Sequence, residues 1–256
     1  MAVKNFITAS IVTHNDYQQA NNAINSLKEN TKNSDLKIYV FDNSSDSANE
    51  KLLTACDMYI KNDNNLGFGK AHNKILEFPM GKYHAIINPD ITIKSDVLSA
   101  LADVLDKNPD ICMVAPKIMN SNGTEQKLPK RNPTAKYLFL GRLALLGGCF
   151  KKIRDKYTRA DENFTDITDI EFCSGCFFMI RSEVFKKLGG FDERYFMYLE
   201  DADLTRNARR FGRTVFCPDI EVEHLWERGS AKSLKLLLIH LNSFFKYLRK
   251  WKNELR

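Results

Sequence analysis

Residues 6–27 of the chain read FITASIVTHNDYQQANNAINSL, and this stretch indicates the class of fold. Its first part, Phe6–Thr13, is apolar and rich in β-branched residues, which is typical of a buried strand. The second part, Tyr17–Leu27, carries apolar residues at helical spacing. A strand that runs into a helix is the unit that connects parallel strands, so the stretch predicts an α/β fold.

The same alternation continues through the first half of the chain. Further buried strands are predicted at Lys37–Phe41, His84–Asn88 and Cys112–Ala115. Further helices are predicted at Ala71–Phe78 and Asp96–Leu105. This order predicts a mostly parallel, Rossmann-like sheet flanked by helices, and ligands bind such sheets at the carboxyl ends of the strands.

Polar clusters follow three of the predicted strands, at residues 13–15 (THN), 42–46 (DNSSD) and 88–90 (NPD). These residue types also form turns and helix caps, so each cluster taken singly has that alternative explanation. Three clusters at successive strand ends favour a ligand site. Asp90 is the candidate carboxylate that a divalent cation would bridge to a diphosphate, because hard cations prefer oxygen ligands.

A long excursion interrupts the alternation between Lys117 and Asp169, where proline and glycine are frequent. Such excursions are often functional. Within it, Tyr137–Phe150 is predicted to be a core helix, with a lip facing an acceptor or a membrane as the alternative. Regular structure is predicted to return at Glu171–Arg181 (strand), Leu199–Phe211 (helix), Thr214–Cys217 and Glu221–His224 (strands).

Residues 200–203 (EDAD) place three acids at the start of a predicted helix. The helix dipole favours acids there, and this alone explains them without any function. Glu200 and Asp203 share one helix face, however, whereas Asp201 points elsewhere and is free to face a cleft. A hydroxyl that attacks a carbon atom needs one such positioned carboxylate as a general base.

Three other segments contain candidate ligand groups. The glycines of residues 65–73 (NLGFGKAHN) allow close approach to a ligand, but their spacing fits neither a dinucleotide fold nor a P-loop. His224, at a strand end, is either a structural residue or a second ligand of the Asp90 metal site. Residues 173–176 (CSGC) have the spacing of half a zinc site, but no second pair accompanies them, which favours structural thiols.

Together these segments resemble the family 2 glycosyltransferases of GT-A fold, and within them the bacterial rhamnosyltransferase-like branch. The resemblance runs from Phe6 to about Trp251. Its strongest part is residues 189–206, GGFDERYFMYLEDADLTR, which is similar to the acceptor-side signature GGFDE…F…EDxDLxxR of the family. Asn88 departs from the family pattern, because it replaces the first acid of the usual Asp-x-Asp metal motif.

The resemblance implies a role for each matching residue. Asp201 is the catalytic base, Asp42 accepts from the pyrimidine ring, and Asp90 with His224 holds Mg²⁺ or Mn²⁺. Glu200 and Arg131 are predicted to contact the acceptor. The residues expected to bind the donor are Thr13, Asn15, Asp42, Asn65, Gly67, Asn73, Asn88, Asp90, Ser174 and Gly175.

The implied reaction is a single inverting displacement from a nucleotide sugar to a hydroxyl of a lipid-linked glycan or growing cell-surface polysaccharide. The branch suggests dTDP-rhamnose as donor, with a UDP-sugar as the alternative. A non-catalytic relative that binds a nucleotide or carbohydrate is the rival interpretation, for which Asn88 is the support. Nucleic-acid binding is excluded, because no aromatic platform interleaves with the basic residues.

The predicted organisation is a GT-A domain at residues 1–229, followed by a basic amphipathic helix at residues 230–256. Residues 1–116 form the nucleotide-sugar half of the domain and residues 117–229 the acceptor half. The net charge of +6 resides in the tail from Lys232 onward, which has seven basic residues and one acid. An amphipathic tail of this kind either packs on the core or lies on an anionic bilayer.

The expected location is the cytoplasm, with peripheral association at the inner face of the cell membrane. No leader pattern precedes Phe6, and no apolar run approaches the length needed to span a bilayer. The six scattered cysteines are expected to be reduced thiols. The sequence leaves oligomerisation open.

Overall fold

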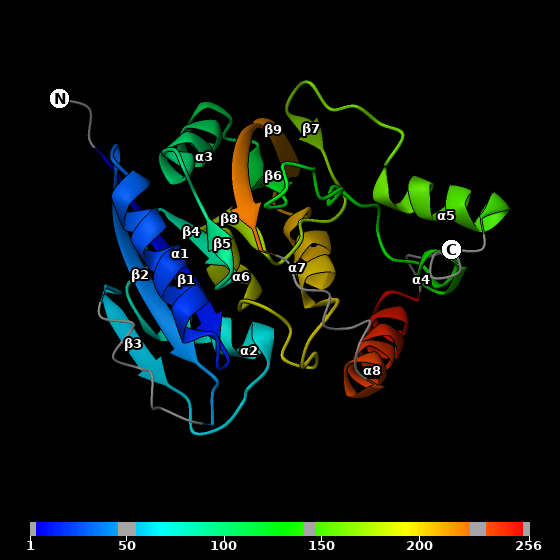
Figure 1. Ribbon diagram of the computed structural model, residues 1–256, viewed down its shortest axis with the longest axis horizontal. Helices are drawn as coiled ribbons and strands as arrows, with labels where there is room; N and C mark the ends of the chain where they lie inside the picture. The colour runs from blue at the N-terminus through cyan, green and yellow to red at the C-terminus, as the bar shows by residue number, and fades with distance from the viewer. Residues whose placement is uncertain (1–3, 46–54, 141–146, 226–233, 253–256) are drawn as a thin grey trace.

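The computed structural model describes residues 4–45, 55–140, 147–225 and 234–252, and a nine-stranded mixed sheet runs through this part of the chain (Figure 1). The order across the sheet is β3-β2-β1-β4-β8-β6-β9-β5, and β7 also pairs with β9. The strands are β1 (Asn5–Thr13), β2 (Ser34–Asp42), β3 (Met58–Lys61), β4 (Tyr83–Ile87), β5 (Ile91–Thr92), β6 (Ile111–Met119), β7 (Thr168–Asp169), β8 (Phe177–Arg181) and β9 (Arg213–His224).

The direction of the strands decides where their ends meet. β1 is parallel to β2 and β4, β2 is parallel to β3, and β6 is parallel to β9. β8 is antiparallel to both β4 and β6, so these two neighbours of β8 point the same way. The predicted mostly parallel sheet is confirmed. Its carboxyl edge therefore collects the ends of the parallel strands together with the beginning of β8.

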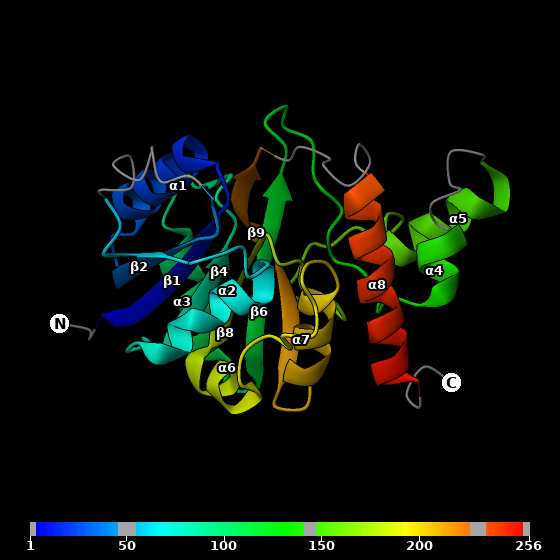
Figure 2. The same ribbon diagram turned by 90° about the horizontal axis from the view of Figure 1, so that it is seen from below.

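Helices cover both faces of the sheet (Figure 2). One apolar cluster lies between the sheet and α1 and α3, and a second lies between the opposite face and α2, α6 and α7. The helices are α1 (Tyr17–Asn30), α2 (Phe68–Asn73), the 3₁₀ helix η2 (Lys74–Glu77), α3 (Val97–Lys107), α4 (Ala135–Leu140), α5 (Gly148–Thr158), α6 (Ser182–Leu188), α7 (Glu200–Ala208) and α8 (Leu234–Trp251).

Three predicted strands differ from the observed ones for local reasons. The strand expected from Glu171 begins only at Phe177, since the N–H groups of Cys173 and Gly175 donate to side chains of α7 instead of to a neighbouring strand. The two strands expected between Thr214 and His224 are the single strand β9. β9 absorbs the intervening proline through a shift of its register with β6.

Two predicted helices also differ. The helix expected at Ala71–Phe78 begins earlier, at Phe68, and tightens into the 3₁₀ helix η2 at Lys74. The single helix expected over Tyr137–Phe150 is replaced by the end of α4 and the start of α5. Gly147, at φ +73°, precedes α5 in a conformation that a helix interior does not contain. Residues 141–146 lie outside the described part.

The C-terminal helix α8 packs on the core with one face. Phe244, Tyr247 and Trp251 are buried in a cluster with residues such as Tyr195 and Leu199, which belong to the segment before α7. α8 lies beside α4 and α5 at the end of the molecule away from β3 (Figures 1 and 2). None of the helices within the described residues is long and apolar enough to cross a bilayer.

A hydrogen-bonded histidine pair is buried between β1, β4 and α2. The Ser10 hydroxyl lies 2.7 Å from His72 Nδ1 and 3.0 Å from His84 Nε2, and all three residues are fully buried. Burial lowers the pKa of His72 well below its usual value, and it lowers the pKa of His84 to about 3. Both rings are therefore neutral in the folded protein near neutral pH.

We expect this pair to make the fold sensitive to mild acid. Because the folded pKa lies below the unfolded one, the unfolded chain binds protons first as the pH falls below about 6.5. Below that pH, each ring that stays neutral in the folded protein lowers the free energy of unfolding by about 1.4 kcal/mol for every pH unit. Urea unfolding of wild type and His84→Gln should show their difference in stability changing by about 2 kcal/mol between pH 6.5 and 5. A difference independent of pH would contradict the assignment.

Candidate active site

The carboxyl edge of the sheet brings the predicted site residues together. Thr13 and Asp42 end β1 and β2 and face each other in register. Asp90 follows β4, and His224 ends β9. Gly175 precedes β8, and the antiparallel direction of that strand places its beginning at this same edge. The strand directions therefore build the site.

Asp42 lies at the donor side of this edge and is fully buried. Its Oδ2 accepts from Tyr17 Oη at 2.8 Å, Tyr59 Oη at 2.6 Å and Lys61 Nζ at 3.1 Å. Its Oδ1 accepts from the Ser44 N–H at 2.8 Å. Burial by itself raises the pKa of Asp42, but these hydrogen bonds outweigh burial and lower it. The carboxylate is ionised and held by the protein, and its contact with a pyrimidine ring stays a prediction.

Asn43 holds the glycine-containing loop in place, a role that the sequence did not reveal. Its Nδ2 donates to the Gly67 carbonyl at 2.9 Å, and its Oδ1 accepts from Asn62 Nδ2 at 2.9 Å. Asn65 Oδ1 accepts from the Gly67 N–H at 2.9 Å. Gly67 has φ +82°, and a Cβ there would lie 2.1 Å from the carbonyl oxygen of Phe196. Only glycine lets this loop approach the segment that precedes Asp201.

Asn73 acts on the site indirectly. Its Oδ1 accepts from the Phe191 N–H at 2.7 Å, and its Nδ2 donates to the Phe191 carbonyl at 2.8 Å. A Cβ on Gly190 would lie 2.2 Å from Asn73 Oδ1, which explains the glycine there. The side chain thus clamps the start of the signature segment, and a direct donor contact stays a prediction.

Thr13 and Asn15 flank the end of β1 differently. Thr13 is fully buried, and its hydroxyl has no hydrogen-bond partner among the described residues. Asn15 is exposed at φ 67°, and its N–H donates to Ser44 Oγ at 2.7 Å. The left-handed turn at Asn15 bends the chain away from the strand, as expected for asparagine. Both residues lie at the predicted donor side.

Asp90 and His224 meet through backbone pairing. Ile91 of β5 pairs with His224 of β9, and the Leu225 N–H donates to the Asp90 carbonyl at 3.0 Å. His224 Nε2 then lies 3.1 Å from Asp90 Oδ1. Neither atom has a hydrogen-bond partner among the described residues. Two facing acceptor atoms at this distance need a proton or a cation between them, so the pair suits a divalent metal.

Few protein side chains are placed to bind a metal beside Asp90 and His224. Among the described residues, no group of three His, Cys, Asp or Glu side chains is arranged to hold a metal ion. Asn88, whose amide replaces the first acid, is near the pair in sequence, and its backbone N–H donates to the Cys176 carbonyl at 2.8 Å. Asp90 and His224 would therefore supply two protein ligands to such a metal, and a bound molecule or water would have to supply the others.

Asp201 is held at the start of α7 by backbone donors. Its Oδ2 accepts from the Gly175 N–H at 2.9 Å, and its Oδ1 accepts from the Ala202 N–H at 2.9 Å. A Cβ on Gly175 would lie 3.3 Å from Asp201 Cβ, so the glycine permits this close approach. Burial raises the pKa of Asp201, while the Gly175 N–H and the positive charge of Lys130 oppose that rise.

Glu200 precedes Asp201 in the sequence, but its side chain is buried inside the protein. It is 5% exposed, and its Oε2 has no partner among the described residues. Burial and the neighbouring Asp201 charge raise the pKa of Glu200 well above its usual value. We therefore assign the negative charge of the pair to Asp201. Glu200 is thus buried in this structure, and its predicted acceptor contact stays a prediction.

Arg131 is taken up by internal contacts. Its guanidinium donates to Glu162 Oε1 at 3.2 Å and to the Lys156 carbonyl at 3.2 Å, and it lies 3.7 Å from Glu171 Oε1. The contacts with Glu162 and Lys156 hold the excursion together, and the contact with Glu171 joins it to the segment that follows. The predicted acceptor contact of Arg131 stays a prediction.

Lys130 is a site residue that the sequence did not single out. A backbone bridge pairs it with Phe172, and its Nζ lies 5.3 Å from the centre of the Phe172 ring. Among the described residues, no acid lies within ion-pair distance of its ammonium group. Burial lowers the pKa of Lys130, and the charge of Asp201 opposes that effect. In the sequence, the sign of this residue was its position directly before Arg131, which was predicted to contact the acceptor.

We expect Lys130→Met to shift the pH dependence of activity. Because the lysine charge favours the ionised form of Asp201, its loss should move the acid limb of kcat/KM upward by about one pH unit. The measurement is a pH profile of initial rates. Lys127→Met is the matched control, since Lys127 pairs with Glu125 at 2.7 Å. An unmoved acid limb in Lys130→Met would contradict the role.

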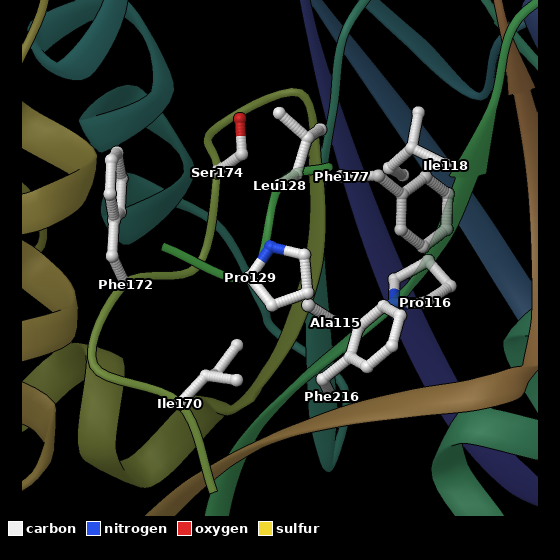
Figure 3. Close-up of a pocket in the computed structure, with 10 residues that line it drawn as sticks. All are labelled: Ala115, Pro116, Ile118, Leu128, Pro129, Ile170, Phe172, Ser174, Phe177 and Phe216. Carbon is white, nitrogen blue, oxygen red and sulfur yellow. The ribbon is translucent and has the colours of Figure 1, made fainter. Parts of the chain in front are cut away.

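A cavity beside Ser174 is too small to be the donor site. It lies between residues such as Pro129, Phe172 and Phe216, with the Ser174 hydroxyl at its margin (Figure 3). Its volume is about 10 Å³, which is room for one water molecule. The cavity therefore does not accommodate a sugar.

Comparisons with known proteins identify the family and the fold. The family model for glycosyl transferase family 2 matches residues 8–189. An N-acetylglucosaminyl-diphospho-decaprenol L-rhamnosyltransferase of Mycobacterium tuberculosis is 28% identical over an alignment of 175 residues, and the match covers 62% of this chain and 56% of the relative. The Escherichia coli rhamnosyltransferase WbbL is 26% identical over an alignment of 196 residues, and the match covers 71% of this chain and 70% of the relative.

Solved structures support the same fold. The structure of GalNAc-T7 with UDP, GalNAc and Mn²⁺ has a TM-score of 0.66 at 15% identity, covering 89% of this chain and 45% of its own. The Pyrobaculum calidifontis mannosyltransferase PcManGT with GDP-Man and Mn²⁺ has a TM-score of 0.65 at 16% identity, covering 97% of this chain and 65% of its own. The fold is that of the GT-A glycosyltransferases. With the family model spanning most of the domain, the chain belongs to glycosyl transferase family 2, in the branch that contains bacterial rhamnosyltransferases.

Proposed function

We propose that the protein transfers a sugar from a nucleotide diphosphate to an acceptor hydroxyl with inversion. The observation that carries this is the position of the Asp201 carboxylate, which is held by the Gly175 N–H at the edge where Asp90 and His224 also lie. The acceptor oxygen attacks the anomeric carbon and its proton passes to Asp201. The bond from that carbon to the diphosphate oxygen breaks, and the nucleoside diphosphate leaves. One displacement inverts the anomeric centre.

Asp90 and His224 are the residues that would hold Mg²⁺ or Mn²⁺. A divalent cation there supplies charge stabilisation for the departing diphosphate. Two observations support this assignment: both facing side-chain atoms lack a hydrogen-bond partner among the described residues, and two similar structures contain Mn²⁺. The replacement of an acid by Asn88 predicts that the metal binds weakly until a diphosphate supplies further oxygen ligands.

The donor and acceptor follow from the relatives. Two similar curated proteins are rhamnosyltransferases, which favours dTDP-rhamnose; similar solved structures with UDP make a UDP-sugar the alternative. The mycobacterial relative acts on a decaprenol-linked sugar, which favours a lipid-linked glycan as acceptor. The chain spans only 56% of that relative, so substrates are part of the proposal.

The test is a transfer assay with dTDP-rhamnose and UDP-N-acetylglucosamine, with Mn²⁺ or with EDTA, and a prenyl-diphosphate-linked N-acetylglucosamine acceptor. We expect transfer with one donor, loss of transfer with EDTA, and an inverted anomeric configuration by NMR. Donor binding without turnover under all these conditions would favour the non-catalytic alternative.

We also propose that α8 places the protein on the inner face of the cell membrane. On its outer face, the side chains of Leu234, Leu238 and Phe245 are 73%, 58% and 61% exposed, whereas its other face is buried. Lys235 and Arg249 are exposed on the same helix. An apolar stripe flanked by basic side chains matches an anionic lipid surface.

Co-sedimentation with phosphatidylglycerol vesicles tests this placement. Leu238→Ser with Phe245→Ser should reduce the bound fraction several-fold, whereas Phe211→Ser, another exposed phenylalanine (47%), should not. Equal binding of all three proteins would contradict the proposal. A change of oligomeric state in the double variant, seen by light scattering, would instead assign the stripe to contact between copies.

A further inference from the structure

A buried glutamine, Gln126, contacts the Nδ1 side of the His224 ring. His224 Nδ1 lies 3.1 Å from Gln126 Oε1, and Gln126 is 6% exposed. The Gln126 backbone is fixed as well, because its N–H donates to the Ile118 carbonyl at 2.8 Å. Gln126 follows β6 and belongs to no recognised motif. It nevertheless touches the side of the ring opposite Asp90.

Neighbouring acceptors determine which way the Gln126 amide points. Its Nε2 lies 3.3 Å from the backbone carbonyl of His224 and 2.8 Å from Asn120 Oδ1. A carbonyl oxygen only accepts hydrogen bonds, so the atom facing it must be the NH₂ group. The reversed amide would set oxygen against oxygen. Oε1 is therefore the atom that faces the His224 ring.

This orientation decides the tautomer of the histidine. An amide oxygen cannot donate, so His224 Nδ1 must carry the proton. In the neutral ring, Nε2 then has a free lone pair, and this is the atom that lies 3.1 Å from Asp90 Oδ1. If the proton were on Nε2, that atom would donate a hydrogen bond to Asp90. It would then have no lone pair with which to bind a metal.

We infer that Gln126 is a positioning residue that keeps His224 in the Nδ1–H tautomer, so that Nε2 and the Asp90 carboxylate face a divalent cation together. The inference rests on the proposed metal-assisted transfer. In metal sites generally, a ligand histidine donates its other N–H to an acceptor, and loss of that acceptor weakens metal binding by about 10–100-fold. Gln126 has the geometry of that acceptor.

The network extends beyond the glutamine in one direction. Asn120 Nδ2 donates to Thr124 Oγ1 at 2.9 Å, and Thr124 Oγ1 donates to Asn122 Oδ1 at 2.6 Å. The hydrogen bonds therefore run in one direction, from Gln126 to Asn120, then to Thr124 and then to Asn122, away from the histidine. This order is consistent with only one direction for the Gln126 amide.

The experiment measures Mn²⁺ affinity by electron paramagnetic resonance with saturating dTDP, and with UDP in a parallel titration. Gln126→Met removes the acceptor at similar volume and should weaken Mn²⁺ binding about 10–100-fold. Gln126→Glu keeps an acceptor oxygen and should retain more of the affinity. His224→Gln is the reference for loss of the ligand, and thermal unfolding checks that each variant is folded.

A second readout reports the tautomer without any metal. Long-range ¹H–¹⁵N NMR, with the His224 signal assigned by its loss in His224→Gln, should show Nδ1–H in wild type and a shift toward Nε2–H in Gln126→Met. An Nε2–H ring in wild type, or equal Mn²⁺ affinity in wild type and Gln126→Met, would overturn the inference alone. Wild type that binds no Mn²⁺ with either nucleotide would overturn the metal part of the proposed function as well.

Discussion

Asp201→Asn should lower the rate of sugar transfer by about 100-fold or more, with donor affinity nearly unchanged. The amide keeps one oxygen that accepts from the Gly175 N–H and loses the acceptor for the Ala202 N–H, so one of the two backbone contacts is retained. It cannot take the proton of the acceptor hydroxyl. The loss should therefore appear in kcat rather than in donor binding, as measured by initial rates and by calorimetric titration of the donor.

Two controls sharpen this result. Glu200→Gln should reduce kcat far less than Asp201→Asn, because Glu200 is already assigned as the protonated member of the pair. Glu193→Gln changes an acid of the same segment whose side chain is 49% exposed and pairs with Lys70. A kcat of Asp201→Asn within threefold of wild type would show that the base is another group.

Asp203→Ala should lower the free energy of unfolding by about 3–5 kcal/mol, because it removes one partner of a buried ion pair. Asp203 is 1% exposed. Its Oδ1 accepts from Trp251 Nε1 at 2.8 Å, and its Oδ2 accepts from Lys250 Nζ at 2.6 Å. Both donors belong to α8, so the variant loses the polar contacts that fasten this helix to α7.

Urea unfolding followed by tryptophan fluorescence measures the change. Asp192→Ala is the matched control, since Asp192 also accepts from Lys250, at 2.7 Å, but its side chain is 20% exposed. It should cost about 1 kcal/mol or less, as expected for a partly solvated pair. A loss below that value in Asp203→Ala would mean that apolar packing alone holds α8 on the core.

The fold was largely predictable because its signals are local. The alternation of β-branched strands and amphipathic helices recurs from β1 to α3, and buried parallel strands need this pattern. Where prediction failed, a tertiary contact competed with the local pattern. The N–H groups of Cys173 and Gly175 bind α7 side chains, so the strand expected from Glu171 begins only at Phe177.

The candidate site was predictable only in part. Asp90, Asp201 and His224 stand at the ends or beginnings of elements, where ligand-binding residues are expected, and the long signature supports Asp201. Lys130 and Gln126 carry no such mark, because a lysine in a proline-rich segment and a glutamine in a turn are usually solvated. The structure alone shows that Lys130 lies over the Phe172 ring, where the charge of Asp201 acts on it, and that Gln126 faces the His224 ring.

The sequence by itself determined the α/β class, the family and the carboxylates at the strand ends, because periodicity and motif are properties of neighbouring residues. Tertiary structure decided the rest. The three acids at the start of α7 look alike in sequence, yet Glu200 turns inward, Asp201 meets the Gly175 N–H and Asp203 holds α8. Burial and distant partners set the charge and role of each carboxylate, and those depend on which parts of the chain meet in the folded protein.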